Sequence, residues 1–362
     1  MKFIRLLIYI FIIIPTVAQT HTPNSLLNPA AIQKLYSMMQ DFHAILSNNN
    51  VPYFITCGTL LGAVRNQKII KWDDDIDIGI FDIDADRFCK LESEFNARGY
   101  QLSKCPEGYF FKIAPSDGEP CRNGGDWVGN YPWIDVMVWA QYGNKIVYHK
   151  DGPWASVTES EFIDIDLFPL KKYQLGNLSL WGPNNPKNFL DRVYPKWESI
   201  YTIDICRIHN KVDNVSGNIV IRKAELKDTA ALTNLLGQLG YPQISNEMCE
   251  SKIKIFSDNK LDTVWVISLN NNIVGCLALN IITPFYKAGL FARIDAIVVD
   301  EHHRKLGFGR MLTEIAEEYA KNIGCTKIFL TSGKHRFWAQ NFYSNLDFIS
   351  DATYFVKSLE SV

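Results

Sequence analysis

The sequence predicts an α/β protein built from two domains. Its 362 residues exceed what one ordinary hydrophobic core accommodates. The segment "VDNVSGN", residues 212–218, is polar and rich in turn-forming residues, which is typical of a linker. Strand-like and helix-like patterns precede this segment and start again after it. We therefore expect a first domain over residues 28–211 and a second over residues 219–362.

Composition excludes some classes of partner and site. The chain carries 37 Lys and Arg residues against 39 Asp and Glu residues, so no excess positive charge is available to neutralise nucleic-acid phosphates. No nucleic-acid partner is expected. The eight cysteines include no C-x-x-C pair, which gives no indication of a structural zinc site. Their even number permits disulfides without requiring them.

The first residues are typical of a secretory leader. Lys2 and Arg5 precede the apolar run "LLIYIFIII", and Thr-Val-Ala at positions 16–18 offers a cleavage site. This run is short for a membrane span, which needs ~20 apolar residues. We expect a signal peptide or short anchor over residues 1–18, and export or entry into the secretory pathway, with a cytoplasmic protein as the alternative. A membrane would be a partner only if this leader is retained.

The first domain opens with a helical pattern over residues 28–48, followed by the apolar segment "VPYFITCG" and by strands and turns to about residue 170. Its most unusual stretch is "WDDDIDIGI", which holds four aspartates in six residues. Alternate residues of an extended chain share a face, so Asp73, Asp75 and Asp77 should point one way while the isoleucines point into the core. The sequence therefore predicts a row of carboxylates beside a buried strand.

A row of carboxylates beside a core is costly, because the groups repel one another and lose hydration. A divalent cation removes both costs, and hard oxygen ligands select Mg²⁺ or Mn²⁺. A solvated acidic turn is the alternative, but it does not explain Trp72 and the three alternating isoleucines.

Upstream, "GTLLGAVRNQKIIK" places two glycines four residues apart at a strand-to-helix junction, where a backbone can approach a phosphate and helix-start amides can bind it. Together, "YFITCGTLLGAVRNQKIIKWDDDIDIGI" resembles the signature of the LicD family, which includes fukutin-related proteins. The likeness continues in "PWIDVMVW" and "DLFPLKKYQLGNLSLWGPNNPKNFLDRVYPKW". It covers roughly residues 30–200.

The LicD resemblance implies a nucleotidyltransferase-like mixed-sheet domain that moves a phospho-substituent, such as phosphocholine or ribitol phosphate, from a CDP-linked donor to a glycan acceptor. It implies that Asp135 orients or deprotonates the acceptor hydroxyl. The metal ligands that it implies are Asp73, Asp75, Asp77 and Asp135. The residues that it places near the donor are Gly58, Thr59, Gly62 and Arg65. For Asp135, a hydrogen-bonded structural residue is the alternative.

The second domain predicts alternating strands and helices. "NIVIRKAELKD" is typical of a strand followed by a helix start, and "TVWVISLNNNIVGCLALNII" of a hairpin that turns at the asparagines. "RIDAIVV" indicates a buried strand, and "CTKIFLTS" another. Between them, "GRMLTEIAEEYAKNIG" has helical periodicity with Gly324 as its C-cap. These patterns predict a complete small α/β domain.

Within this domain, "VVDEHHRKLGFGRML" ends a strand and opens a helix with Arg304-x-x-Gly307-x-Gly309. Several backbone amides and a helix dipole would converge there, where a pyrophosphate could sit. With "LTSGKHRFWAQNFYSNLDF" downstream, the segment resembles the acetyl-CoA loop and closing segment of the GNAT superfamily of N-acetyltransferases. The likeness covers about residues 218–362 and is nearest to acetyltransferases for aminoalkylphosphonates and small amines.

The GNAT resemblance implies acetylation of a small amine by acetyl-CoA, with Tyr343 protonating the departing thiolate and Asp295 as a candidate base. Tyr343 packing a helix and Asp295 capping a loop are the alternatives. The residues assigned to the pyrophosphate are Arg304, Lys305, Leu306, Gly307, Phe308, Gly309 and Arg310. Those assigned to the pantetheine arm are Ile297, Val298 and Val299. Asp347 replaces a glycine that is common in the family, which predicts a strained turn that Asp tolerates better than most residues.

The sequence thus predicts a bifunctional transferase. Two other functions remain open: a scaffold in which one or both domains are inactive, and a sugar-nucleotide glycosyltransferase with a D-x-D motif. CDP-linked and UDP-linked donors would distinguish the two kinds of transferase. Basic residues 334–336 offer positive charge to a phosphorylated or phosphonate-bearing amine, or are ordinary solvated loop charges.

Overall fold

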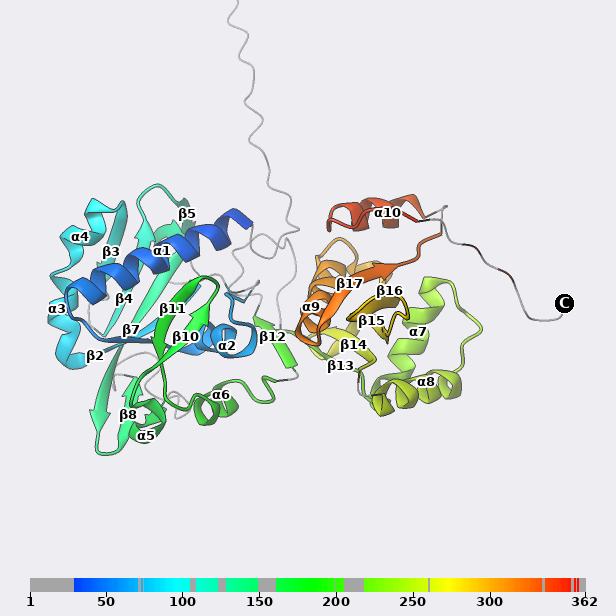
Figure 1. The fold of residues 1–362 in the computed structure, drawn as a ribbon, viewed down its shortest axis with the longest axis horizontal. Coiled ribbons are helices and arrows are strands. Elements are labelled where there is room, and N and C mark those ends of the chain that lie inside the picture. The colour runs from blue at the N-terminus through cyan, green and yellow to red at the C-terminus, as the bar shows by residue number, and fades with distance from the viewer. Residues whose placement is uncertain are drawn as a thin grey trace, which may run out of the picture.

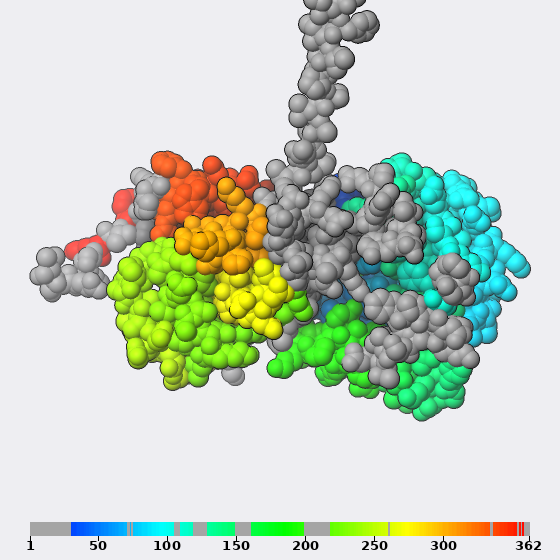
Figure 2. Space-filling view, turned by 180° about the vertical axis from the view of Figure 1, so that it is seen from behind, coloured from blue at the N-terminus to red at the C-terminus, as the bar shows by residue number. Residues whose placement is uncertain are grey.

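The elements of the chain gather in two lobes, one from the N-terminal and one from the C-terminal part of the sequence (Figure 1). The computed structural model describes residues 29–70, 73, 75–104, 109–122, 128–148, 161–198, 200–204, 218–259, 261–333, 336–352, 355 and 357. Figure 2 shows the lobes from behind, with the N-terminal one in blue to green and the C-terminal one in yellow-green to red. Among the described residues no helix has the length and apolar character to cross a membrane. The expected leader, residues 1–18, lies outside them.

A mixed sheet forms the N-terminal lobe, as expected for a nucleotidyltransferase-like domain. Its strand order is β1-β2-β7-β4-β3, and β2 and β7 run parallel while the other pairs are antiparallel. The strands are β1 (Tyr53–Ile55), β2 (Asp75–Phe81), β3 (Tyr100–Lys104), β4 (Phe110–Pro115) and β7 (Trp133–Tyr142), with β8 (Lys145–Tyr148) paired to β7 and β9 (Glu161–Ile163) paired to β8.

Strand β2 lies between β1 and β7, and its isoleucines belong to the hydrophobic core. Ile76, Ile78 and Ile80 are fully buried. Each contributes about 1.5–3 kcal/mol of burial free energy. The alternation predicted for this stretch is confirmed, since the intervening Asp75 and Asp77 belong to one cluster of carboxylates.

Helices and short hairpins surround the sheet. The expected helix over residues 28–48 is α1 (Pro29–Asn48), which starts at a proline and buries Leu35, Met38, Phe42 and Ile45 at helical spacing. The others are α2 (Cys57–Asn66), η1 (Asp82–Asp84), α3 (Ala85–Cys89), α4 (Glu92–Ala97), α5 (Asp164–Leu167) and α6 (Lys187–Val193). Two hairpins pair β5 (Glu119–Arg122) with β6 (Val128–Tyr131), and β10 (Lys171–Leu175) with β11 (Leu178–Gly182).

The C-terminal lobe is built on a six-stranded sheet with its strands in sequence order. All neighbours are antiparallel except the last pair, β16 and β17, which is parallel. The strands are β12 (Ile200–Asp204), β13 (Asn218–Lys223), β14 (Thr263–Leu269), β15 (Asn272–Ile282), β16 (Leu290–Val299) and β17 (Cys325–Leu330). The helices are η2 (Leu226–Asp228), α7 (Thr229–Leu239), α8 (Asn246–Asp258), η3 (Glu301–His303), α9 (Phe308–Asn322) and α10 (Phe337–Ser344).

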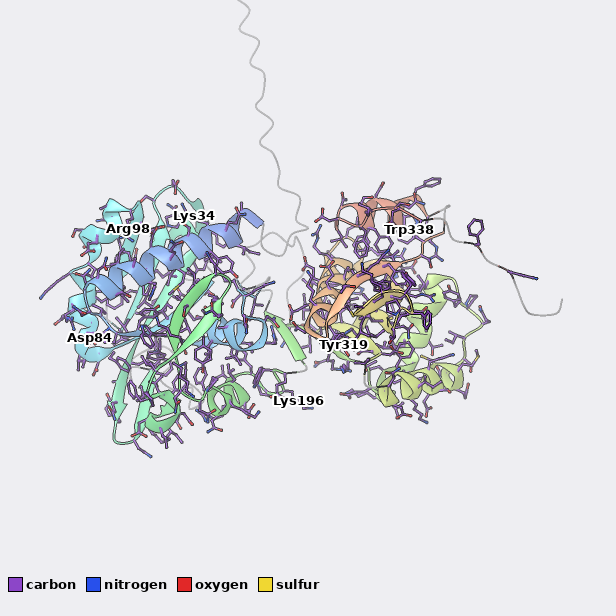
Figure 3. All side chains as sticks on the ribbon, in the orientation of Figure 1. Lys34, Asp84, Arg98, Lys196, Tyr319 and Trp338 are labelled. Carbon is purple, nitrogen blue, oxygen red and sulfur yellow. The ribbon has the colours of Figure 1, made fainter. Side chains whose placement is uncertain are left out.

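Local sequence accounts for the turns of this lobe. The predicted hairpin joins β14 to β15 through Asn270 and Asn271, both with positive φ, which asparagine tolerates better than most residues. Helix α9 is followed by Gly324 at φ +84°, as expected of a helix end. Tyr319 of this helix (Figure 3) donates a 2.8 Å hydrogen bond from its hydroxyl to the carbonyl of Leu261, in the segment just before β14.

The edge of the second sheet begins before the predicted linker. Strand β12 pairs with β13 in five registered positions, from Ile200 opposite Arg222 to Asp204 opposite Asn218. Residues 212–217 of the linker lie outside the described residues. The sheet of the C-terminal lobe therefore includes five residues that sequence reasoning assigned to the first domain, because a strand this short gives no sign of the sheet it joins.

Candidate active sites

The aspartates of the N-terminal lobe converge on one point. Each of Asp73, Asp75 and Asp77 offers a carboxylate oxygen, and these oxygens all lie within 4.8 Å of one another. Asp75 and Asp77 are each only 8% exposed, whereas Asp73, just before β2, is half-buried. Carboxylate oxygens at such separations suit a hard divalent cation.

The start of α2 holds Asp77 in place. The backbone N–H of Gly58 donates to Asp77 Oδ2 at 2.8 Å, and the backbone N–H of Asp77 donates to Thr59 Oγ1 at 2.8 Å. A Cβ at Gly58 would lie 2.2 Å from Asp73 Oδ2 and 3.1 Å from Asp77 Oδ2. Glycine is needed here because the carboxylates approach the helix backbone closely. Gly58 and Thr59 thus hold the aspartates in this structure, and their contact with a donor stays a prediction.

The other two residues expected near the donor lie farther along α2. Gly62 is inside the helix, and its carbonyl accepts the backbone N–H of Lys68 at 3.3 Å. A Cβ there would lie 2.5 Å from the Lys68 carbonyl oxygen, which explains the glycine by packing. Arg65 is half-buried in the last turn. Donor contacts by these two residues also stay predictions.

Asp135 lies on the neighbouring strand, directly opposite Asp77 in the parallel β2–β7 ladder. Burial raises the pKa of Asp135 to about 7, against the opposing pull of the Lys112 ammonium and with the added repulsion of Asp75. A carboxyl with a pKa near neutrality is suited to accept a proton.

Sequence reasoning missed Lys112. This residue of β4 stands opposite Asp135 in the β4–β7 ladder, and its ammonium forms an ion pair with Asp135 Oδ1. Its Nζ also lies 4.4 Å from the centroid of the Trp133 ring. The available signal was a lone lysine in the apolar run "YFFKIAP", since a charge inside a buried strand needs a partner.

The residues present fit a divalent cation. Three buried or half-buried carboxylates have oxygens within 4.8 Å of one another, and Gly58 lacks the side chain that would displace one of them. Bringing several carboxylates this close costs free energy through repulsion and desolvation, which a cation would offset. Asp135 is outside the group whose oxygens all lie within 4.8 Å of one another, so its ligation stays a prediction.

A second candidate site lies where β16 passes into α9. Gly307 precedes the helix at φ +85°, a conformation that suits glycine, and Lys305 also has positive φ, +66°. The amides at the start of α9 have no partner in the preceding turn of the helix, so they form an anion-binding end. A Cβ at Gly309 would lie 3.2 Å from Phe342, so α10 packs closely on this end. The predicted segment, Arg304–Arg310, therefore contains two residues with positive φ and the first amides of α9, and its contact with a pyrophosphate stays a prediction.

A network that sequence reasoning missed holds this loop. Asp300 accepts hydrogen bonds from Gln238 Nε2 at 2.9 Å and from the backbone of His302 at 3.1 Å, and it pairs with His303 Nδ1 at 2.7 Å. Gln238 Oε1 accepts the backbone N–H of Glu301 at 2.9 Å. These contacts fix the chain between the strand and the helix. The Gln238 contacts join residues 62 and 63 positions apart in the chain, which no local pattern indicates.

Strand β16 has one open edge next to the loop. Ile297, Val298 and Val299 pair with β15, whereas the registered pairing with β17 ends at Ile294 and Leu330. Within the described residues, the part of β16 after Ile294 therefore has no ladder partner in β17 on the side away from β15. Backbone groups on that side are available to an extended ligand, and the assignment of residues 297–299 to the pantetheine arm stays a prediction.

The predicted proton-transfer residues lie on different elements. Tyr343 is in α10, and burial raises the pKa of its hydroxyl against the opposing effect of Arg336, so it retains its proton at neutral pH. Asp295 is the extra residue of a β-bulge between Ile294 and Ala296, and its carboxylate lies 3.2 Å from the Arg293 guanidinium. Its side chain is exposed.

The prediction for Asp347 is confirmed, because this residue has φ +63° in the turn after α10. In the same segment, exposed Trp338 is on α10 (Figure 3). Residues 334 and 335, two of the three basic residues proposed for an anionic acceptor, lie outside the described residues. The third, Arg336, donates to the Leu239 carbonyl at 2.9 Å, so part of its guanidinium has a structural role.

Comparison with known proteins assigns each lobe to a family model. Residues 50–185 match the LicD/FKTN/FKRP nucleotidyltransferase domain, and residues 231–348 match the acetyltransferase (GNAT) family. An uncharacterized protein of Rickettsia typhi is 35% identical over 164 residues, 45% of this chain and 46% of that protein. Human ribitol 5-phosphate transferase FKRP is 28% identical over 168 residues, 45% of this chain and 31% of its own length. The match thus spans about half or less of these relatives.

Other likenesses are shorter or rest on structure. Lipopolysaccharide cholinephosphotransferase LicD of Haemophilus influenzae is 36% identical over 52 residues, 14% of this chain and 20% of that protein. Glucosamine-6-phosphate N-acetyltransferase from Arabidopsis thaliana aligns with 39% of this chain and 99% of its own, at 23% identity and a TM-score of 0.35. A transcriptional regulator from Bacillus halodurans aligns with 39% of this chain and 99% of its own, at 25% identity and a TM-score of 0.37.

Proposed function

We propose that this chain, which carries a LicD/FKTN/FKRP nucleotidyltransferase domain and a GNAT acetyltransferase domain, is a bifunctional transferase. Its N-terminal domain would move a phospho-substituent from a CDP-linked donor to a glycan hydroxyl. Its C-terminal domain would acetylate a small amine with acetyl-CoA. The observation that carries the first activity is the convergence of Asp73, Asp75 and Asp77 beside Asp135.

In the phosphotransfer, the acceptor oxygen attacks the phosphorus that bears the substituent, and the bond from that phosphorus to the oxygen of CMP breaks. Asp135 takes the acceptor proton, for which its raised pKa is suited. A bound Mg²⁺ or Mn²⁺ would supply positive charge to the diphosphate and the leaving CMP. Asp73, Asp75 and Asp77 would hold that cation, and Gly58 and Thr59 keep Asp77 turned toward it.

The phosphotransfer is tested with the purified full chain, Mn²⁺ and CDP-choline, CDP-ribitol or UDP-sugars, by measuring nucleotide release with and without a glycan acceptor. We expect the chain to release CMP from one of the CDP-linked donors. This release should stop when the metal is chelated, and it should be at least 100-fold slower in Asp77→Asn. Both CDP-linked donors are tested because one relative is named a ribitol 5-phosphate transferase and another a cholinephosphotransferase. Release of UDP instead would indicate the glycosyltransferase alternative. Tight nucleotide binding without turnover would indicate a binding protein.

In the acetyl transfer, the amine nitrogen attacks the thioester carbonyl carbon, and the bond from that carbon to the CoA sulfur breaks. Tyr343 would donate its proton to the departing thiolate, and its raised pKa keeps that proton in place before the reaction. Asp295, turned outward by its bulge, would accept the amine proton directly or through water. The loop at Gly307 and the open edge of β16 would bind the pyrophosphate and the pantetheine arm.

The acetyltransferase activity is tested by calorimetric titration with acetyl-CoA and by a thiol-release assay on small amines with and without a phosphate. Gly307→Glu should abolish binding, because it sets an anion where the pyrophosphate would lie. Tyr343→Phe should retain binding and lower turnover ~10² to 10⁴-fold, the usual contribution of a general acid. Absence of acetyl-CoA binding by the unmodified chain would refute this activity while leaving the phosphotransfer untouched.

Export remains part of the proposal, supported by the leader pattern of residues 1–18. N-terminal sequencing of the mature protein should find a first residue near Gln19. An intact Met1 on protein from the cytoplasm would refute export.

A further inference from the structure

Lys112 is a buried cation beside the aspartate cluster, and the phosphotransfer described above does not use it. The residue is only 8% exposed, and its ammonium forms an ion pair with Asp135 Oδ1. The two residues stand directly opposite one another in the β4–β7 ladder, so the backbone itself sets their contact. An ammonium buried to this extent is stable only with such a partner.

Aromatic rings fix the place of this ammonium. Lys112 Nζ lies 4.4 Å from the ring centroid of Trp133 and 5.3 Å from that of Phe110. Both distances are within the range of a cation–π interaction, which strengthens when the cation is desolvated. Trp133 is itself buried on β7, two residues before Asp135. The pair is therefore held from two strands and by the packing between them.

The ion pair divides the carboxylates of the site into two kinds. Asp73, Asp75 and Asp77 form the group whose oxygens lie within 4.8 Å of one another, and Asp135 is outside that group. Asp135 is nevertheless next to it, directly opposite Asp77 in the sheet. A carboxylate whose charge is already matched by an ammonium is a poorer ligand, because the ammonium repels a second cation at the same oxygen pair.

We propose that Lys112 is a positioning residue that keeps Asp135 out of the metal's ligand set and reserves it for the acceptor hydroxyl. The metal site is then formed by Asp73, Asp75 and Asp77 alone. This inference rests on the metal-dependent phosphotransfer proposed above, and it replaces the double role that the family resemblance gives to Asp135 with a single one.

Two consequences distinguish this role from ordinary packing. Removing the ammonium by Lys112→Met frees Asp135 to join the ligands and removes a positive charge from beside the cation. The affinity for Mn²⁺ should therefore rise at least tenfold while transfer slows at least tenfold. Conversely, Asp135→Asn should abolish transfer yet leave Mn²⁺ affinity within about threefold of the unmodified chain, because Asp135 supplies no oxygen ligand to the ion.

The test measures Mn²⁺ binding to the full-length chain by calorimetry, with the free-ion signal in electron paramagnetic resonance as a second readout. Lys112→Arg, which keeps the charge, should keep both affinity and activity within tenfold. Lys104→Met is the matched control, because this lysine is on the adjacent strand β3, is exposed, and faces a ring at 5.8 Å without contacting the aspartates. It should change neither quantity. Thermal unfolding of every variant checks that it is folded.

The results separate this inference from the function on which it rests. If the unmodified chain binds no Mn²⁺, the proposed function fails. If it binds Mn²⁺ but Asp135→Asn weakens binding more than tenfold, Asp135 is a ligand and the inference is overturned. A folded Lys112→Met variant with unchanged or weaker Mn²⁺ affinity also overturns it. If Lys112→Met does not fold, the Mn²⁺ affinities of Asp135→Asn and Lys112→Arg decide whether the inference stands. A change of more than tenfold in either affinity overturns it.

Discussion

Replacing Gly58 by alanine is the sharpest perturbation of the metal site, because it adds one methyl group and no charge. The new Cβ would lie 2.2 Å from Asp73 Oδ2, whereas ordinary contact begins at 3.4 Å. The carboxylate must therefore move by about 1 Å, several times the ~0.2 Å tolerance of a metal–ligand distance. The 3.1 Å approach to Asp77 Oδ2 adds to this displacement. We expect Mn²⁺ affinity to fall at least tenfold.

The assay is thermal or urea unfolding with and without Mn²⁺. At a metal concentration 100 times the dissociation constant, the bound ion stabilises the unmodified chain by about 2.7 kcal/mol, and a tenfold weaker site leaves about 1.4 kcal/mol. Gly237→Ala is the control, since a Cβ on this α7 residue meets nothing within 4 Å. It should add ~0.5–1 kcal/mol with or without metal. Metal-dependent stabilisation of Gly58→Ala equal to that of the unmodified chain would refute the reasoning.

Three further outcomes follow from the structure. Burial raises the pKa of Asp135 to about 7, and a general base must be deprotonated to act, so kcat/KM for phosphotransfer should fall about tenfold per pH unit below 7 and level off above it. A flat profile from pH 5.5 to 8.5 would contradict the role of Asp135 as a base. Asp347→Gly should raise the free energy of unfolding in urea by about 0.5 kcal/mol, because the relief of left-handed strain at φ +63°, about 1–2 kcal/mol, exceeds the extra chain entropy of glycine, about 0.5–1 kcal/mol. A loss of stability would count against this. A fragment of residues 199–362 should unfold at a higher temperature than one of residues 213–362, since only the longer retains β12; equal midpoints would show that this strand adds nothing.

Much of the aspartate cluster follows from the sequence, because it depends on the period of one strand. Alternation within "DIDIGI" is sufficient to place Asp75 and Asp77 on one face and the isoleucines on the other. The positive φ of Asp347 was likewise predictable, since it depends on a single turn. Features of this kind are decided by residues that are neighbours in the chain.

The features that sequence reasoning missed are decided by residues far apart in the chain. Lys112 meets Asp135 only because β4 and β7 pair in one register, and a shift of one residue would turn the lysine to the other face. The Gln238–Asp300 contact likewise depends on how α7 packs beside the loop. The hydrogen bond from the Gly58 amide was missed for the same reason, because its acceptor, Asp77, is 19 residues away.

The position of β12 has a consequence for how such a two-part protein can be inherited. A recombination event that breaks the gene within the polar segment would separate a five-residue strand from the sheet it completes. The acetyltransferase part would then have β13 as its edge strand, with backbone groups left unpaired by the loss of β12, and other chains could pair with that edge. A break before residue 200 carries the whole sheet across intact. The unit that can be exchanged between genes is therefore longer than the segment that matches the family model, which begins at residue 231.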